Sequence, residues 1–438
     1  MDDWKQESID SFCNSVRDGT HDSPKPCDTG RYLITSRHII GGNVDLNKAY
    51  LISQEDFDEV NKRSKVDQWD VLITMIGTVG EVCLVKTTPD FAIKNVGLFK
   101  SKGELHGKWL YYYLISPEAQ TQIEASKRGT TQSYLPLEEL RRFEIKVPTD
   151  RSRMPSIVDI LSSLDDKIEL NRRTNETLEA LAQALFKDWF VDFGPTRAKA
   201  EGQAPYLAPE LWELFPDALN EKDKPERWKV KTLGDYISLT KGRSYKSAEL
   251  QESDTALVTL KSFQRGGGYR RDGLKPFTGN YKPEQVIKPG ELIVALTDVT
   301  QAADVIGKPA IVSVDSSYKT LVASLDVGIL RAQNKKVSLP YLYCLLRTEE
   351  FQNHIYGHCS GTTVLHLGKQ GIPSYELRMP PASLLAFFED LASPVFSQIA
   401  ANEEESRTLE QTRDLLLPKL MSGEIHLCDA EKAVEAVL

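Results

Sequence analysis

Few residues in this sequence have the types and spacing that catalysis or metal binding requires. His354 and His358 are one helical turn apart, and Cys359 follows them, a pattern that could hold zinc. The equivalent positions of an internal repeat, described below, hold no zinc ligands. A solvated helix end is therefore the better interpretation, and we expect no metal site here.

A second group of acidic residues could belong to a nuclease. Pro216 and Asp217, with Glu221, resemble a carboxylate set, but they lie in a segment rich in Pro, Gly and charge that is typical of a linker. The sequence has no Asn/Asp-Pro-Pro-Tyr/Phe methyltransferase motif. Gly307-Lys308 lacks the upstream glycine and the following Ser or Thr of a phosphate-binding loop. We therefore expect a chain with no catalytic residues and no cofactor of its own.

Basic residues in the second half are better suited to bind a ligand. The whole chain has a formal net charge of -9, but residues 226–382 contain 21 Lys and Arg against 15 Asp and Glu. Lys and Tyr suit phosphate contacts, Arg pairs with guanine, and glycine lets the backbone approach a duplex. We expect DNA contacts from two clusters, for which a solvated hairpin tip is the alternative: Lys241, Arg243, Tyr245 and Lys246; and Lys261, Arg265, Tyr269, Arg270, Arg271 and Lys275.

The first half offers weaker candidates of the same kind. Residues 1–148 contain 19 Lys and Arg against 22 Asp and Glu, so a positive surface there would have to be local. Threonine in a strand is more often structural than functional. The candidates are Thr20, His21, Lys25, Arg37, His38, Thr78, Lys127, Arg128, Thr130 and Gln132, with Thr362 as a further one in the second half.

A long internal repeat organises the chain. Residues 109–148 align with residues 341–380 without a gap, with 12 identities in 40 positions, and Gly129-Thr130-Thr131 falls on Gly361-Thr362-Thr363. Such a period is far too long for a solenoid and indicates a duplicated domain. In each copy we expect mixed α and β structure, with strands at 71–74, 143–147, 292–296 and 375–379 and one helix at 109–126 or 341–356.

One difference between the copies concerns a glycine turn. Gly77, Thr78 and Gly80 have Thr297, Asp298 and Thr300 as their expected counterparts. Contacts inferred for one copy therefore should not be transferred to the other.

A heptad pattern follows each copy. Apolar residues recur at spacings of three and four, which is typical of a coiled-coil seam, with Asn171, Asn175 and Asn402 among them. Asparagine at such a position costs stability but fixes register, so we expect Asn171 to face Asn402 in an antiparallel pair. The second seam is expected to begin at Ser393-Pro394 and to end at Pro418. The alternative is that each helix packs only on its own domain.

The expected order of domains follows from these patterns. Segments 151–192 and 384–425 are the two heptad helices, and the tail has no assigned role. The full division is 1–150 as first domain, 151–192 as first helix, 193–225 as linker, 226–383 as second domain, 384–425 as second helix and 426–438 as tail.

The composition is that of a globular protein with 40% hydrophobic and 27% charged residues. Its six cysteines form no C-x-x-C pair, and the N-terminus does not resemble a signal peptide. No apolar run approaches the roughly 18 residues of a membrane span. We therefore expect a cytoplasmic protein with no membrane partner.

The order of these parts, with several local motifs, resembles the specificity (S) subunits of type I restriction-modification systems over nearly the whole chain. The similar stretches are DVLITMIGTVG, the block from GTTQSYL to IKVP, ALFKDWFVDFGP, PERWKVKTLGDY and LLLPKLMSGEI. The resemblance implies an α+β fold: two duplicated α/β target-recognition domains joined by two long antiparallel coiled-coil helices, with pseudo-two-fold symmetry. Helices of about 30 residues span roughly 45 Å, which suits half-sites about one duplex turn apart.

The same resemblance implies a function and partners. Each target-recognition domain would read one half of a bipartite, asymmetric DNA site. The subunit would be non-catalytic and would recruit two methyltransferase (M) subunits and two restriction (R) subunits, with S-adenosylmethionine, ATP and Mg on those partners only. Two other functions stay open: a coiled-coil scaffold whose duplicated domains bind protein, and a self-contained restriction nuclease.

Overall fold

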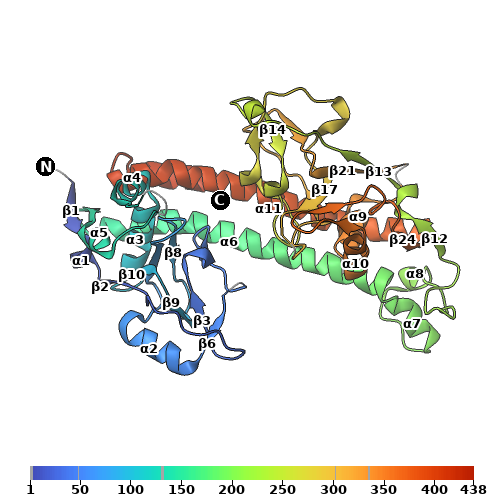
Figure 1. Ribbon diagram of the computed structural model, residues 1–438, viewed down its shortest axis with the longest axis horizontal. Coiled ribbons are helices and arrows are strands. Elements are labelled where there is room, and N and C mark those ends of the chain that lie inside the picture. Colours follow the sequence, from blue (N-terminus) through green and yellow to red (C-terminus); the bar gives the residue numbers. More distant parts are fainter. Residues whose placement is uncertain (1–2, 48, 130–132, 301, 334–335) are drawn as a thin grey trace. The chain divides into compact units, whose positions relative to one another are not determined.

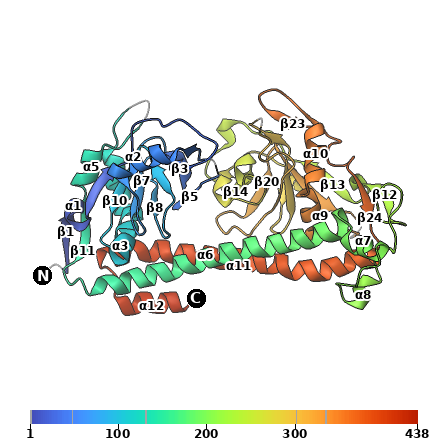
Figure 2. The same ribbon diagram turned by 90° about the horizontal axis from the view of Figure 1, so that it is seen from below.

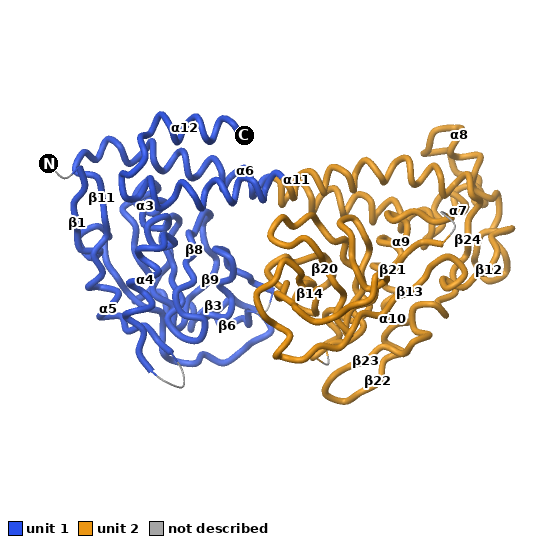
Figure 3. Tube along the Cα trace, turned by 90° about the horizontal axis from the view of Figure 1, so that it is seen from above, with its two compact units in different colours: residues 1–170, 405–438 blue, residues 171–404 orange. Residues whose placement is uncertain are grey.

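The structure is a computed structural model that describes residues 3–47, 49–129, 133–300, 302–333 and 336–438 (Figure 1). It divides into two compact units (Figure 3). Unit 1 comprises Met1–Leu170 and Glu405–Leu438, and unit 2 comprises Asn171–Glu404. Two long helices, α6 (Arg153–Phe186) and α11 (Ala382–Ser422), therefore each contribute one stretch to either unit.

Unit 1 contains a four-stranded antiparallel sheet of order β2-β10-β7-β8 and a three-stranded sheet of order β6-β3-β9, in which β3 and β9 run parallel. Two further pairs are β1-β11 and β4-β5. The strands are β1 (Trp4–Ser8), β2 (Ser15–Asp18), β3 (Arg31–Ile34), β4 (Ile39–Ile40), β5 (Asn43–Val44), β6 (Leu51–Ile52), β7 (Val71–Thr74), β8 (Val82–Leu84), β9 (Phe91–Ile93), β10 (Val96–Lys100) and β11 (Glu144–Pro148).

The continuous apolar run in β7 follows from its place inside unit 1. Side chains alternate between the two faces of a strand, and both faces of β7 are covered. Val71 and Ile73 pack in one hydrophobic core with Trp109, whereas Leu72 packs in a second core with Phe91. The helices of this unit are α1 (Ile9–Phe12), α2 (Gln54–Ser64), α3 (Glu104–Ile115), α4 (Pro117–Ser126), α5 (Leu137–Arg142) and α12 (Leu427–Glu435).

Unit 2 repeats this topology. Its sheet β13-β21-β17-β19 matches the four-stranded sheet of unit 1, its pair β12-β24 matches β1-β11, and β14 runs parallel to β20 as β3 does to β9. The strands are β12 (Lys229–Thr232), β13 (Ile237–Lys241), β14 (Thr255–Val258), β15 (Lys275–Pro276), β16 (Val286–Ile287), β17 (Leu292–Ala295), β18 (Thr297–Asp298), β19 (Pro309–Ile311), β20 (Thr320–Ala323), β21 (Val327–Ala332), β22 (Cys359–Ser360), β23 (Leu365–Leu367) and β24 (Glu376–Met379). The predicted α+β fold with duplicated domains is confirmed.

The single helix predicted in each copy is wrong. Unit 1 has α3 followed by α4, and unit 2 has α9 (Leu339–Leu346) followed by α10 (Glu349–Gly357). The break comes from a side-chain cap at the same place in both. Ser116 accepts a hydrogen bond from the backbone N–H of Ala119, and Thr348 accepts one from Phe351. A capping residue has extended backbone angles, so it begins a new helix.

The predicted ends of the second heptad helix are also wrong. α11 begins at Ala382 and continues through both Pro394 and Pro418 to Ser422. A proline removes one backbone hydrogen bond but does not end a helix whose flanking turns are held by packing. Leu384 and Phe388, before Pro394, are fully buried in the core of unit 2.

The helix pair is antiparallel in each unit taken by itself. In unit 1 the guanidinium of Arg413 donates to Asp165 at 2.7 Å, and Lys167 pairs with Glu405 at 3.3 Å. In unit 2 Asn171 contacts Asn402, while Asn175, further along α6, contacts Ile399, which precedes Asn402 on α11. Each unit therefore contains one stretch of α6 and one stretch of α11.

The segment expected to be a linker is folded. It contains α7 (Gly194–Ala200) and α8 (Pro209–Trp212), and Phe193, Leu211 and Phe215 are buried in the core of unit 2. The tail forms α12, which lies along the helix pair of unit 1 (Figure 2), with Ala430 and Val434 in its core.

One described helix has the length and composition that could cross a membrane. It is α11, and its sequence is interrupted by Glu389 and Asp390. Leu384, Phe388 and Ala392 of the same stretch are buried in the core of unit 2.

Candidate nucleic-acid interface

Strand register brings three loops of unit 1 to one end of its sheets. Asp18 at the end of β2 pairs with Gly97, and Thr74 at the end of β7 pairs with Val96, so both strands end beside the start of β10. The turn between β9 and β10 joins the loop after β2 to the end of β3. The backbone N–H of Thr20 donates to Ile93 at 3.0 Å, and that of Lys94 donates to Ile34 at 2.8 Å.

Unit 2 gathers the equivalent loops in the same way. Lys241 at the end of β13 pairs with Gly328, and Ala295 at the end of β17 pairs with Val327. The backbone N–H of Arg243 donates to Ala323, and that of Ser324 donates to Val258, each at 3.0 Å. Each unit therefore presents one cluster of loops at the same end of its sheet.

A glycine begins the first of these loops in both units because the backbone passes too close for a side chain. A Cβ atom at Gly19 would lie 2.4 Å from the carbonyl oxygen of Ile93. At Gly242 it would lie 2.2 Å from the carbonyl oxygen of Ala323. The Thr20 and Arg243 candidates directly follow these glycines, so they occupy equivalent positions.

Candidates of unit 1 in the first loop and the following turn differ in accessibility. His21 is exposed and its ring contacts Asn95 at 2.8 Å and Asp18 at 3.0 Å. Lys25 and Arg37 are exposed. His38 is buried, and its Nδ1 accepts a hydrogen bond from the backbone N–H of Thr35 at 2.9 Å. Burial lowers the pKa of His38, so it serves as a neutral turn residue rather than as a surface cation.

The remaining candidates of unit 1 lie near the glycine-threonine segment. Lys127 forms an ion pair with Glu124. Arg128 pairs with Glu139 at 2.6 Å and keeps 59% of its side chain exposed. Thr78 is exposed in the loop after β7. Thr130 and Gln132 lie outside the described residues.

In the first basic cluster of unit 2 the lysines and the arginine differ. Lys241 and Lys246 are exposed, and neither forms an ion pair within the described part of the chain. Arg243 instead pairs with Glu249 at 2.9 Å and lies 5.2 Å from the ring centre of Phe277. Tyr245 is partly buried beneath Lys275, whose Nζ lies 5.5 Å from the ring centre. Lys275 also donates to the Tyr245 hydroxyl at 3.4 Å.

The second basic cluster is partly internal. Arg265 lies 3.8 Å from Asp304, Arg270 pairs with Asp272, and Arg271 donates to the hydroxyl of Ser313 at 3.0 Å. The hydroxyl of Tyr269 is buried without a hydrogen-bond partner among the described residues, and its ring packs against a core of unit 2. Burial raises the pKa of Tyr269. Its side chain is thus partly buried against this core rather than fully exposed. Thr362 is exposed in the hairpin β22–β23, at the end of unit 2 away from α6 (Figure 3).

Two cations in different units occupy equivalent places, which the sequence comparison missed. Arg37 lies on a short 3-10 turn, Ser36–His38, directly after β3, and Lys261 lies on the turn Leu260–Ser262 directly after β14. Both side chains are exposed. The shift between these turns is 224 residues rather than 232, because loops further along differ in length.

The loop that follows the central strand, which is β7 in unit 1 and β17 in unit 2, is anchored alike in both units. In unit 1 the side-chain amide of Gln120 donates to the carbonyls of Gly80 and Leu114 at 3.2 and 2.7 Å. In unit 2 Gln352 donates to Gly307 and Leu346 at 3.1 and 2.6 Å. The expected correspondence of Gly80 with Thr300 is therefore wrong, and its counterpart is Gly307. The signal in the sequence was the spacing, since each glycine lies two residues before the next strand.

Between these anchors the two loops differ in length. Three residues separate Ile76 from Gly80, whereas nine separate Thr297 from Gly307. Ile76 bridges to Tyr134 as Thr297 pairs with His366, so both loops run beside the segment that carries the glycine-threonine repeat.

A buried carboxylate holds the longer loop. Asp298 is 1% exposed and accepts hydrogen bonds from the backbone N–H groups of Thr300, Val305 and Ile306 at 2.9, 2.7 and 3.2 Å. Burial raises the pKa of Asp298, but these donors outweigh it and hold the pKa below its usual value. In the short loop Gly77 takes the place of Asp298, with a φ of 83° that favours glycine.

The histidines considered as zinc ligands bond to the backbone instead. The ring of His354 contacts the carbonyl of Gly371 at 2.8 Å, and that of His358 contacts the carbonyl of His354 at 2.9 Å. Across the described ranges, no three His, Cys, Asp or Glu side chains gather as a metal site.

Comparison with known proteins agrees with this fold. Residues 1–180 match the family model described as the type I restriction modification DNA specificity domain. The chain is 25% identical over 367 residues to the type I restriction enzyme HindI specificity subunit of Haemophilus influenzae, covering 73% of this chain and 77% of that one. It is 27% identical over 370 residues to the MjaIX specificity subunit of Methanocaldococcus jannaschii, covering 82% and 78%.

A solved structure shares the fold. It is the S subunit of a type I restriction-modification system from M. genitalium, with a TM-score of 0.50, 16% identity and coverage of 95% of this chain and 96% of that chain. The solved structure shows the fold alone, whereas the family match over residues 1–180 and the two relatives show that this chain is similar to type I restriction-modification specificity subunits.

Proposed function

We propose that this DNA-specificity subunit reads a split, asymmetric DNA sequence, with one unit for each half. The observation that carries the proposal is that the two units share the same sheet topology and loop anchors, which we call the frame. They differ in the loop after β7 in unit 1 and the loop after β17 in unit 2. Both units gather their loops at the same end of the same sheet, while the loop after the central strand differs in length and in how it is held. A shared frame suits the phosphate backbone, which is the same at every site, and a differing loop suits different bases.

Contacts to phosphate would come from the exposed cations at equivalent or neighbouring positions. Arg37 in unit 1 and Lys261 in unit 2 lie on matching turns, and Lys241 and Lys246 lie in the adjoining loop of unit 2. Each such contact adds a sequence-independent, salt-dependent contribution to binding. This explains how a chain of net charge -9 would bind DNA, since the positive groups are local.

Base contacts would come from the loop after the central strand. In unit 2 the described residues of this loop include Val299, with 67% of its surface exposed, and no Lys or Arg. A loop without cations has little affinity for phosphate, but apolar and hydroxyl groups can contact base edges, including the thymine methyl group. We infer that Asp298 holds this loop in the shape that fits one half-site.

The proposed partners follow from the same function. The chain would work without chemistry of its own in the cytoplasm and would bring two methyltransferase and two restriction subunits to the DNA. S-adenosylmethionine, ATP and Mg would then belong to those partners.

The test is co-expression with the methyltransferase encoded beside this chain, followed by mapping of N6-methyladenine across the host DNA. A split asymmetric motif that appears only when this chain is present is the expected result. A complex that assembles and binds S-adenosylmethionine but methylates no such motif would contradict the proposal and favour a scaffold.

A further inference from the structure

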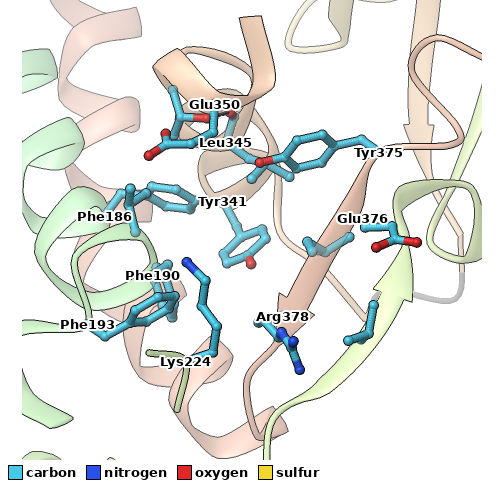
Figure 4. Close-up of a pocket in the computed structure, with 14 residues that line it drawn as sticks. Phe186, Phe190, Phe193, Lys224, Tyr341, Leu345, Glu350, Tyr375, Glu376 and Arg378 are labelled. Carbon is cyan, nitrogen blue, oxygen red and sulfur yellow. Dashed lines mark hydrogen bonds between the residues drawn. The ribbon is translucent and has the colours of Figure 1, made fainter. Parts of the chain in front are cut away.

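Unit 2 contains a cavity that has no role in the proposed DNA interface. Its volume is about 200 Å³, and it lies between the end of α6, helix α9 and the pair β12–β24 (Figure 4). Phe186, Phe190 and Leu345 form apolar walls. All of the residues that line it belong to unit 2.

A buried hydroxyl group points into this cavity. Tyr341 is only 2% exposed, and the centre of its ring lies 5.1 Å from that of Phe186 and 5.2 Å from that of Phe190. Its hydroxyl forms no hydrogen bond with any described residue, and in Figure 4 its oxygen lies on the side of the ring that faces Arg378. Burial raises the pKa of Tyr341, so the group is a donor at neutral pH.

Four charged side chains also line the cavity. Lys224 lies 4.9 Å from the ring centre of Phe193, and both Lys224 and Arg378 line the cavity together with Tyr341 (Figure 4). Neither Lys224 nor Arg378 forms an ion pair within the described ranges of the chain. Glu350 and Glu376 are exposed at the rim.

The corresponding region of unit 1 is filled. There α3 carries Trp109 and Tyr113 where α9 carries Tyr341 and Leu345. The hydroxyl of Tyr113 donates to the carbonyl of Glu144 at 2.9 Å, and the indole N–H of Trp109 donates to the carbonyl of Lys146 at 3.3 Å.

A smaller side chain at the position of Tyr113 therefore opens the cavity of unit 2. Leu345 lacks the phenol ring of Tyr113, and Glu376, the counterpart of Glu144 on β24, lines the space that this ring would occupy. Unit 1 thus shows which group fits: an aromatic ring with a hydrogen-bond donor at its far end.

The size of the cavity favours one side chain over a free ligand. Sites for small molecules and cofactors are usually about 300–1,000 Å³, so a cavity of about 200 Å³ is small for one. Aromatic anchors of protein partners, by contrast, fill pockets of one side chain and dominate the binding energy.

We propose that this cavity receives a tyrosine or tryptophan side chain from a protein partner, with a carboxylate beside it in reach of Lys224 and Arg378. The ring would lie on Leu345 and take the place that Tyr113 has in unit 1. Because unit 1 is filled, each chain would bind this partner segment once, from one of the two proposed methyltransferase subunits. The choice of the methyltransferase as partner rests on the proposed function, but the cavity can be tested without it.

The direct test uses N-acetyltyrosine, which combines a phenol with a carboxylate, titrated into the full chain and followed by saturation-transfer NMR. We expect weak, saturable binding that Leu345→Tyr abolishes and Tyr341→Phe weakens several-fold. Leu345→Tyr reproduces the side chain of unit 1, so it should fold. Leu181→Tyr, the same change at an exposed leucine of unit 2, is the control and should bind as the wild type does. Absence of saturable binding, or equal binding by Leu345→Tyr, would overturn the proposal.

The second test measures the affinity of the co-expressed methyltransferase for the same variants. Leu345→Tyr should lower the affinity at least tenfold, and Leu181→Tyr should not. An unchanged affinity for Leu345→Tyr would overturn the assignment of the partner segment to this cavity. If the wild-type chain bound no methyltransferase, the proposed function would fail, while the N-acetyltyrosine titration would still decide whether the cavity binds aromatic acids.

Discussion

The loop after β7 in unit 1 and the loop after β17 in unit 2 start from the same strand position and end on the same kind of anchor. A glutamine of the neighbouring helix holds the final glycine in both, through Gln120 or Gln352. Between these points a glycine at a positive φ shapes the short loop, and a buried aspartate shapes the long one. The two units have thus kept the same strands and anchors but differ in the loop between them.

This difference separates two kinds of residue. Under the proposed function, positions that are alike in both units serve the fold or contact the phosphate backbone, and positions that differ select bases. Changing the loop alone should change which bases are recognised, and changing the frame alone should change binding to every DNA sequence.

The largest effect is expected from giving the long loop of unit 2 the form of the short one. Replacing residues 298–306 by Gly-Thr-Val should lower methylation of the native site by about 100-fold or more, because each lost base contact costs about 1–3 kcal/mol. Methylation rates on duplexes that vary one half-site at a time check this. The reciprocal replacement, residues 77–79 of unit 1 by the long loop, should affect the other half-site. An equal loss for both half-sites in either variant would contradict the assignment of one half-site to each loop.

A smaller effect is expected from Asp298→Asn. The substituted amide presents an N–H where backbone N–H groups of Val305 and Ile306 need an acceptor, so unit 2 should lose about 2 kcal/mol of stability. Denaturant unfolding measures the loss, and Asp304→Asn, in the same loop, is the control.

The effect of Asp298→Asn should also depend on pH. The folded pKa of Asp298 is lowered, so its contribution is present above the pKa of the unfolded state and is lost as pH falls through the folded value. The stability difference between wild type and variant should therefore narrow below about pH 4. A difference that stays constant with pH would show that the charge of Asp298 does not hold the loop.

Removing one cation of the frame should have a still smaller and more general effect. Lys261→Ala in unit 2 and Arg37→Ala in unit 1 should each weaken DNA binding by about 1 kcal/mol, equally for all sequences, and lower the salt dependence by about one ion. Binding titrations at several salt concentrations, on specific and random duplexes, measure both quantities. A change in sequence preference would show that these residues contact bases rather than phosphate.

The smallest effect on DNA reading is expected from the helix pair. Asn402 donates to the side chain of Asn175 at 2.7 Å, and Asn171 donates to the backbone of Asn402 at 3.4 Å. Asn171→Leu or Asn402→Leu should change the register of the helices before it disturbs either globular domain, because leucine fits several registers. A solved structure of the variant with unchanged pairing would contradict this prediction.

The sequence predicted much of the frame. Strands such as β7 and β17 are short apolar runs between turn residues, and the 232-residue repeat indicated the duplication. The sequence did not predict the break between α3 and α4. The amphipathic pattern continues through Ser116, although the side chain of this residue caps a new helix. Nor did the sequence predict that α11 passes through Pro394 and Pro418, since tertiary packing overrides the local preference.

The candidate interface was harder to predict than the frame. Composition identified the exposed Lys241, Lys246 and Lys261 together with Tyr269 and His38, although Tyr269 is partly buried and His38 is buried. Exposure of a residue in a loop depends on strands far away in sequence. The role of Asp298 was missed because its partners are backbone groups, which carry no signature in the side-chain sequence.

The most direct test of the central claim is a genome-wide map of N6-methyladenine made by the wild-type complex and by the complex with residues 298–306 replaced by Gly-Thr-Val. The account predicts a split motif in which one half is identical in the two maps and the other half is changed or lost. A variant motif altered in both halves, or unaltered in both, would contradict the claim that each unit reads its own half through this loop.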